Sequence, residues 1–135
     1  MALKTTKKFM SKSVVNSEKA PAPIGPYSQA ILAGSTLFVS GQIAIDQSTG
    51  NLLTGDVETE TKQVMANIGE ILKSAGMQFS NVVKCTIFLK NMGDFPKVNA
   101  IYGNYFTSEP PARETVEVSA LPKGVSVEIS CIAVK

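Results

Sequence analysis

Two strand-like segments of this chain carry apolar side chains on both faces, and they constrain the fold more than any other feature. Side chains alternate between the two faces of a strand, and residues 82–90 and 125–134 place apolar residues on each face in turn. These residues are Val83, Cys85, Ile87 and Leu89 against Val82 and Phe88 in the first segment, and Val127, Ile129, Cys131 and Ala133 against Ile132 and Val134 in the second. A sheet that contains such strands must be covered on both sides.

Two other segments have the spacing of amphipathic helices, with apolar residues three or four positions apart. The first begins with Asp56, Glu58 and Glu60, whose charge suits a helix N-terminus, and stops at Gly76. The second follows Asp94, which we expect to cap it. The apolar stripes are Val64, Met65, Ile68, Ile71, Leu72 and Ala75 in the first helix, and Phe95, Val98, Ile101, Tyr102, Tyr105 and Phe106 in the second.

The remaining segments predict a single α+β domain, residues 1–135, with the order β-β-α-β-α-β-β. Three prolines and a glycine exclude regular structure from residues 17–26, and Tyr27 ends this loop. We expect the last two strands to pair as an antiparallel hairpin. The expected strands lie at residues 29–32, 36–40, 82–90, 112–119 and 125–134, with a further candidate at residues 14–15.

The number of helices limits how much of this sheet one chain can cover. Two helices, each about 10 Å wide, cover about four strands at ~4.8 Å spacing, and on one face only. The other face then needs a different cover, and the sheet of another subunit is the simplest one. We therefore predict an oligomer in which sheets pack against each other.

The net charge of +2 arises from the N-terminus. Residues 1–12 contain four lysines and no acidic residue, whereas the rest of the chain has nine basic residues and eleven acidic ones. We expect a basic, disordered tail on a slightly acidic body, which argues against nucleic acid as a partner. No apolar stretch approaches the ~20 residues of a membrane span, so no membrane is expected.

The cysteine pattern predicts a reducing compartment. Cys85 and Cys131 lie far apart in apolar segments without the spacing of a metal site, which is typical of buried thiols in a cytoplasmic protein. The short basic N-terminus leaves organelle targeting open.

The numbers of arginine and histidine residues limit the binding and catalytic chemistry that this chain can carry out. Arg113 is the only arginine, and there is no histidine. A guanidinium grips a carboxylate or phosphate through two parallel hydrogen bonds, although a structural ion pair would also explain a single arginine. Without imidazole, acid–base chemistry near neutral pH falls to a carboxyl, tyrosine, lysine or water. We expect no metal and no cofactor.

Glu128 is the candidate for that acid–base role. It lies between Val127 and Ile129 in an otherwise apolar or small strand, and a buried glutamate is rare unless it is paired or functional. In the expected hairpin, Arg113 faces Ser130 and Thr115 faces Glu128. Arg113 and Glu128 would then be diagonal neighbours, ~7–8 Å apart. This arrangement suits the binding of a small carboxylic acid substrate, but a structural ion pair between the two residues would explain it equally well.

Several segments, in order and at family-like spacing, resemble the RidA (YjgF) family of reactive-intermediate deaminases, also described as perchloric-acid-soluble endoribonucleases. The resemblance extends from about residue 13 to the C-terminus. The matching residues are Ala22-Pro23-Ile24-Gly25-Pro26-Tyr27-Ser28-Gln29, Phe38-Val39-Ser40-Gly41-Gln42, Val98-Asn99-Ala100-Ile101-Tyr102, Pro111-Ala112-Arg113, and Leu121-Pro122-Lys123-Gly124 through Val127-Glu128-Ile129.

The resemblance implies a chorismate-mutase-like fold: a mixed sheet of about six strands with two helices on one face, packed into a trimeric barrel with a pocket at each subunit interface. It implies hydrolysis of enamines and imines such as 2-aminoacrylate and 2-iminopropanoate to 2-oxo acids and ammonia. Arg113 would bind the substrate carboxylate, and Glu128 would position the attacking water. Tyr27, Ser40, Gly41 and Asn99 would line the pocket, and Thr115 would contribute backbone groups near the imine nitrogen.

The sequence departs from the family's pattern near Arg113. Relatives often carry cysteine where this chain has Thr115, and a small residue where it has Glu114. The threonine leaves a backbone role intact, and we expect Glu114 to point away from Arg113. Two other functions stay open: an endoribonuclease or translation inhibitor, and a non-catalytic protein that senses a small 2-oxo acid. A ribonuclease usually needs a histidine or lysine pair beside a basic groove, which this body does not offer.

Overall fold

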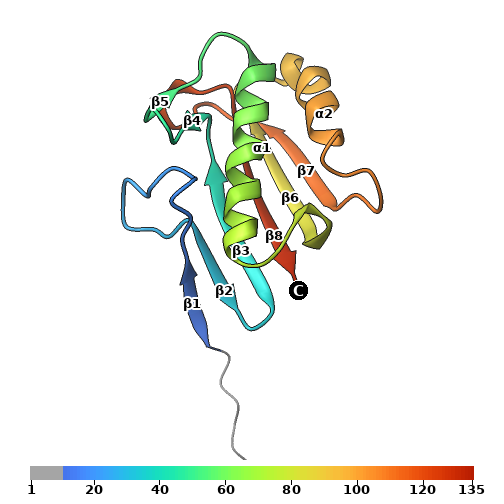
Figure 1. Ribbon diagram of the computed structural model, residues 1–135. Coiled ribbons are helices and arrows are strands. Elements are labelled where there is room, and N and C mark those ends of the chain that lie inside the picture. The colour runs from blue at the N-terminus through green and yellow to red at the C-terminus, as the bar shows by residue number, and fades with distance from the viewer. Residues whose placement is uncertain (1–10) are drawn as a thin grey trace, which may run out of the picture.

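A computed structural model describes residues 11–135, and it contains a six-stranded sheet with two helices on one face (Figure 1). The sheet order is β1-β2-β3-β8-β6-β7, and a two-stranded sheet, β4-β5, lies beside it. The elements are β1 (Lys12–Val15), β2 (Ala30–Ala33), β3 (Thr36–Gln42), β4 (Ile45–Asp46), β5 (Asn51–Leu52), α1 (Val57–Ser74), η1 (Phe79–Asn81), β6 (Val82–Leu89), η2 (Met92–Asp94), α2 (Phe95–Gly103), β7 (Ala112–Glu117), η3 (Pro122–Gly124) and β8 (Val127–Val134). The expected α+β class and the mixed sheet are confirmed.

Both helices form where the apolar period predicts them, but α2 ends at Gly103, so Tyr105 and Phe106 of the predicted stripe lie beyond the helix. Asp56 caps α1, because its carboxylate accepts hydrogen bonds from the backbone amide of Thr59 (2.7 Å) and from its hydroxyl (2.9 Å). Gly76, with φ of 69°, takes the left-handed conformation that ends the helix. The expectation for Asp94 is wrong, because it precedes α2 without a capping hydrogen bond from its side chain.

The core lies between the helices and the sheet, and β8 alternates as predicted, with Val127, Ile129, Cys131 and Ala133 buried against the helices. The face assignment in β6 is wrong for Val82 and Val83. A register shift between Val82 and Lys84 puts Val82 in the core and leaves Val83 48 % exposed on the open face. The extra residue of such an irregularity reverses the alternation.

The expected hairpin of β7 and β8 does not form. Instead, β6 lies between them, antiparallel to β8 and parallel to β7. The reason is the intervening helix: α2 carries the chain from the end of β6 back to the start of β7, and such a crossover joins parallel neighbours. Arg113 is therefore aligned with Cys85, and Glu128 with Phe88.

The sheet face opposite the helices has several exposed apolar side chains: Val14, Phe38, Val83 and Val116. That another subunit covers this face stays a prediction. Most of the expected tail, residues 1–10, lies outside the described residues, and Lys12 belongs to β1 rather than to the tail. Within residues 11–135, no helix is both long and apolar enough to cross a bilayer.

Candidate functional site

An irregularity in β3 brings Glu128 against the backbone of a neighbouring strand. The pairing of β3 with β8 shifts between Val39 and Gln42, so Ser40 and Gly41 lie outside the regular ladder. A Cβ atom at Gly41 would stand 2.8 Å from Cδ of Glu128. The bulge and the missing side chain together make room for this carboxyl group, and bulges recur next to active sites for this kind of reason.

The proline-rich loop beside it is held by one buried side chain, Gln29. Its Oε1 accepts a hydrogen bond from the amide of Ser17 (2.7 Å). Its Nε2 donates to the carbonyl groups of Ser17 (3.0 Å), Ala20 (3.2 Å) and Pro21 (2.9 Å). Because a buried amide is costly unless it is satisfied, these bonds fix the path of residues 17–29.

Two predicted site residues lie on this fixed loop and the adjacent strand. The Tyr27 hydroxyl oxygen accepts a hydrogen bond from the Ile24 amide (3.3 Å), which leaves its hydrogen free to donate. The Ser40 hydroxyl donates to the Ser28 carbonyl (2.6 Å). Both side chains therefore have defined positions before any ligand binds.

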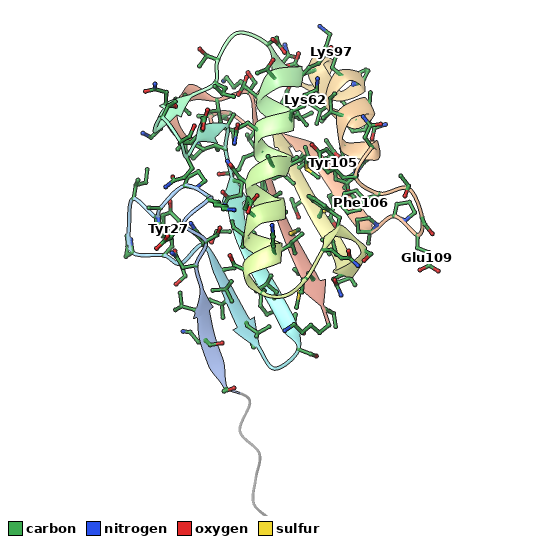
Figure 2. All side chains as sticks on the ribbon, in the orientation of Figure 1. Tyr27, Lys62, Lys97, Tyr105, Phe106 and Glu109 are labelled. Atoms are coloured by element: carbon green, nitrogen blue, oxygen red, sulfur yellow. The ribbon has the colours of Figure 1, made fainter. Side chains whose placement is uncertain are left out.

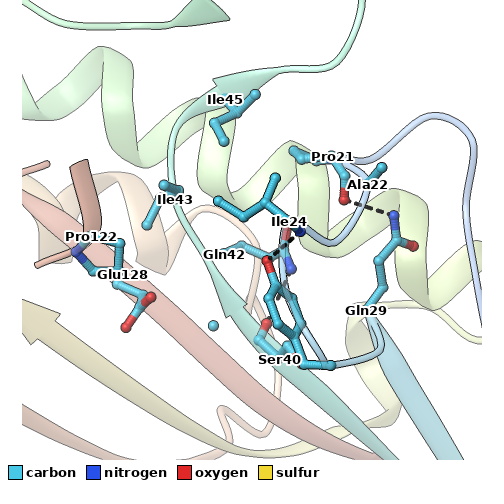
Figure 3. Close-up of a pocket in the computed structure, with 12 residues that line it drawn as sticks. Pro21, Ala22, Ile24, Gln29, Ser40, Gln42, Ile43, Ile45, Pro122 and Glu128 are labelled. Carbon is cyan, nitrogen blue, oxygen red and sulfur yellow. Dashed lines mark hydrogen bonds between the residues drawn. The ribbon is translucent and has the colours of Figure 1, made fainter. Parts of the chain in front are cut away.

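A first cavity of about 380 Å³ opens between the loop, β3 and the start of β8 (Figure 3). Glu128 is half-buried there, and no hydrogen-bond or ion-pair partner within residues 11–135 meets its carboxyl group. Burial raises the pKa of Glu128 above its ordinary value. The lining residues are Pro21, Ala22, Ile24, Tyr27, Gln29, Ser40, Gly41, Gln42, Ile43, Ile45, Pro122 and Glu128.

Arg113 belongs to a second cavity, of about 400 Å³, beside α2. Its guanidinium carbon lies 4.9 Å from the ring centroid of Tyr102 and 5.3 Å from that of Phe95. Its Nη1 donates to Oδ1 of Asn99 at 2.7 Å. These α2 residues share one helical face, so the helix orients the guanidinium. The lining residues are Asn99, Tyr102, Gly103, Phe106, Pro110, Pro111 and Arg113.

The two cavities lie on opposite sides of the chain. In Figure 2, Tyr27 of the first cavity and Phe106 of the second are separated by α1. Arg113 faces the helices, whereas Glu128 is on the open face, with β6 between their strands. The expectation that Arg113 and Glu128 are diagonal neighbours is therefore wrong, because it depended on the hairpin.

The remaining residues near Arg113 lie as follows. Thr115 is on the helix-facing side of β7 next to Ile87, and it lines neither cavity. Its Oγ1 is buried and has no hydrogen-bond partner among residues 11–135. Glu114 points away from Arg113, as expected, and pairs with Lys84 on the open face. The single chain thus groups Tyr27, Ser40, Gly41 and Glu128 in one place, and Asn99 and Arg113 in another.

The cysteines are free and buried, as predicted. Cys85 and Cys131 are direct cross-strand neighbours in β6 and β8. Burial raises the pKa of both thiols, which makes them poor nucleophiles.

Sequence reasoning missed the aromatic partners of Arg113. Phe95 and Tyr102 were assigned only to the apolar stripe of the second helix. Asn99 lies between them in sequence, four residues after Phe95 and three before Tyr102. An amide on an otherwise aromatic helix face could have indicated that this face receives a polar group.

Comparison with known protein families gives a match that covers both cavities and most of the fold. The model of the endoribonuclease L-PSP family matches residues 17–135, and the chain belongs to that family, which includes the YjgF, RidA and RutC proteins.

Individual relatives are similar over nearly their whole length. The chain is 51% identical over 124 residues to the bovine 2-iminobutanoate/2-iminopropanoate deaminase, covering 92% of this chain and 90% of the bovine protein. Among solved structures, the YjgF gene product of E. coli is similar with a TM-score of 0.87 at 40% identity, covering 91% of this chain and 98% of that one. E. coli TdcF, solved with bound serine, has a TM-score of 0.87 at 34% identity, with the same coverage, 91% and 98%.

Proposed function

We propose that the protein hydrolyses 2-imino acids, such as 2-iminopropanoate and 2-iminobutanoate, to 2-oxo acids and ammonia, at sites shared between two copies of the chain. The observation that carries this proposal is the separation of Arg113 from Glu128. One chain holds a carboxyl group in one cavity and an oriented guanidinium on the opposite side. A neighbouring copy would supply the missing half of each site.

Each half has the chemistry that this reaction needs. Arg113 would bind the substrate carboxylate through paired, charge-assisted hydrogen bonds. Glu128 would accept a proton from water as the water oxygen bonds to the imine carbon, and it would pass this proton to the nitrogen, which gives an amino alcohol and restores the Glu128 carboxylate. Transfer of a further proton from the hydroxyl to the nitrogen would then break the carbon–nitrogen bond and release ammonia. The raised pKa of Glu128 brings it nearer to neutral pH, where a proton-transferring group works best.

Other residues of the first cavity would position the substrate. Tyr27 has a hydroxyl hydrogen free to donate, and Ser40 has an oxygen that can still accept. Gly41 would keep the substrate close to the backbone. Backbone groups around Thr115 would approach the imine nitrogen, as the family resemblance implies.

The oligomer is part of this proposal. The exposed apolar side chains of the open sheet face support packing of three such sheets into a barrel. A sensor of 2-oxo acids would need Arg113 but not an unpaired carboxyl group beside the cavity, so Glu128 favours turnover. The free, buried cysteines agree with a reducing compartment such as the cytoplasm.

The first test is ammonia release from freshly generated 2-iminopropanoate, with and without the protein. The second test mixes two inactive variants, Arg113→Ala and Glu128→Gln, after dissociation and reassembly. Shared sites would regain about a quarter of the activity in randomly mixed rings, because a ring with adjacent complementary subunits contains intact sites. Sites contained in one chain would regain none, and that result would refute the shared site.

A further inference from the structure

We infer that the first cavity receives the side chain of the substrate and selects aliphatic 2-imino acids of four to six carbons over 2-iminopropanoate. This inference rests on the proposed function and names the substrates of the same site. It derives from the composition of the cavity wall and from the hydrogen bonds that its polar groups have already made.

Most polar side chains in the wall are engaged within the chain. All the hydrogen bonds of Gln29 go to the loop of residues 17–29, and Gln42 donates to the Ser40 carbonyl at 3.2 Å. The Ser40 hydroxyl donates to the Ser28 carbonyl. The groups left for a ligand are the Glu128 carboxyl, the Tyr27 hydroxyl hydrogen and the side-chain oxygens of Ser40 and Gln42, and these few groups can serve the reacting centre.

The rest of the wall is apolar. Ile24, Ile43 and Ile45 lie on the same side of the cavity in Figure 3, away from Ser40, and Pro21 and Pro122 extend this surface. Ile24 is 71 % exposed in the single chain, although it stands on a loop that Gln29 fixes. An exposed isoleucine held in place at a cavity gains contacts when an apolar ligand group covers it.

The volume of the cavity and the charge of its wall also favour aliphatic substrate side chains. A cavity of about 380 Å³ exceeds what a three-carbon acid fills. Within residues 11–135, Glu128 is the one charged residue in the cavity wall. An acidic substrate side chain would therefore meet a carboxyl group, while the neighbouring copy's Arg113 would already bind the substrate carboxylate. We therefore expect aliphatic side chains to be favoured and acidic ones to be rejected.

The experiment uses a homologous series of imines. An amino-acid oxidase generates them from alanine, 2-aminobutanoate, norvaline and norleucine, with glutamate as the acidic member. Each additional buried methylene group should raise kcat/KM by about fourfold, so the six-carbon imine should exceed the three-carbon one by roughly sixtyfold. The glutamate-derived imine should be the poorest substrate.

Two variants test the wall itself. Ile24→Ser changes an exposed loop residue, and it should lower kcat/KM for the six-carbon imine about tenfold while changing that for 2-iminopropanoate less than twofold. Met92→Ser removes an apolar side chain of 39 % exposure that lines none of the described cavities, and it should leave the whole series unchanged.

A binding measurement separates this inference from the deaminase activity. Calorimetry with the straight-chain 2-oxo acids of three to six carbons should show affinity rising with length in the wild type and rising less in Ile24→Ser. A rising affinity without ammonia release from any imine would support the aliphatic cavity and refute the proposed function. Ammonia release with a flat or falling chain-length profile would overturn the aliphatic cavity and leave the proposed function standing.

Discussion

The sharpest prediction concerns Gly41, because the replacement of a single hydrogen atom by a methyl group should move the proposed catalytic carboxyl. A Cβ at this position would lie 2.8 Å from Cδ, 3.0 Å from Cγ and 3.1 Å from Oε1 of Glu128. Ordinary contact begins at 3.4 Å, so the carboxyl carbon must retreat by about 0.6 Å. Gly41 is not among the glycines with positive φ, so alanine introduces no backbone strain of its own.

The expected effects on activity and stability differ in size. The Glu128 side chain is flexible and can rotate away from a new Cβ at position 41. Gly41→Ala should therefore change the free energy of unfolding by less than ~1 kcal/mol. A general acid–base group contributes about 10²–10⁴-fold, and a misplacement near 1 Å can cost about 10²-fold. We expect kcat on 2-iminopropanoate to fall by roughly ten- to a hundredfold.

The assay compares initial rates of ammonia release and melting temperatures for the wild type, Gly41→Ala and Gly69→Ala, and then for Glu128→Gln with and without Gly41→Ala. Gly69→Ala makes the same chemical change in α1, where the new Cβ meets the Phe79 ring at 3.2 Å, so it should alter stability but not turnover. In a Glu128→Gln background, Gly41→Ala should cause almost no further loss, since the two residues act as a unit. Wild-type activity in Gly41→Ala would refute the argument that Glu128 works from this position.

Further predictions address the assembly, the arginine, the helix cap and metals. Light scattering should give about three chain masses, and a stable monomer at micromolar concentration would contradict the proposed trimer. Arg113→Lys should lower kcat/KM by roughly ten- to a hundredfold with the oligomer intact, because one charge-assisted bond is lost, whereas wild-type activity would refute the carboxylate clamp. Hydrogen bonds from the amide and hydroxyl of Thr59 lower the pKa of Asp56 below 3.8, so its contribution to stability is complete above that pH and is lost below it. The difference in melting temperature between wild type and Asp56→Ala should therefore shrink as the pH falls below 3.8, and a constant difference would contradict this role. Treatment with a chelator should leave deaminase activity unchanged, and activity restored by zinc would overturn the metal-free reaction.

Local sequence patterns predicted the parts of the fold that depend on local interactions. The stripe of α1 and the alternation of β8 each reflect one periodicity, and both were confirmed. The face of Val83 could not be read in this way, because a single irregular pairing at Val82–Lys84 reverses the alternation without any glycine or proline to indicate it. Register depends on the partner strand, which the local sequence does not specify.

The candidate site was predicted residue by residue, but its spatial grouping was not. Arg113 and Glu128 were both singled out by composition and context. Their separation depends on the placement of β6 between β7 and β8, a long-range property that follows from the α2 crossover. Had that crossover been given more weight than the short connection of residues 118–126, the parallel pairing of β7 with β6 could have been predicted.

The environment of Arg113 explains why this chain uses arginine once among lysines. Its guanidinium lies against the rings of Phe95 and Tyr102 and donates a hydrogen bond from one nitrogen to Asn99. Within residues 11–135 its other nitrogens have no hydrogen-bond or ion-pair partner, so they remain available to a ligand. A planar group can stack and still present a fork of donors at its edge, whereas an ammonium group must share its three donors between support and ligand. The contacts with α2 do not neutralise the charge, because rings and an amide replace the carboxylate of a structural ion pair. An oriented but uncompensated cation beside an open cavity is what a carboxylate ligand requires, and this argues against a purely structural role for Arg113.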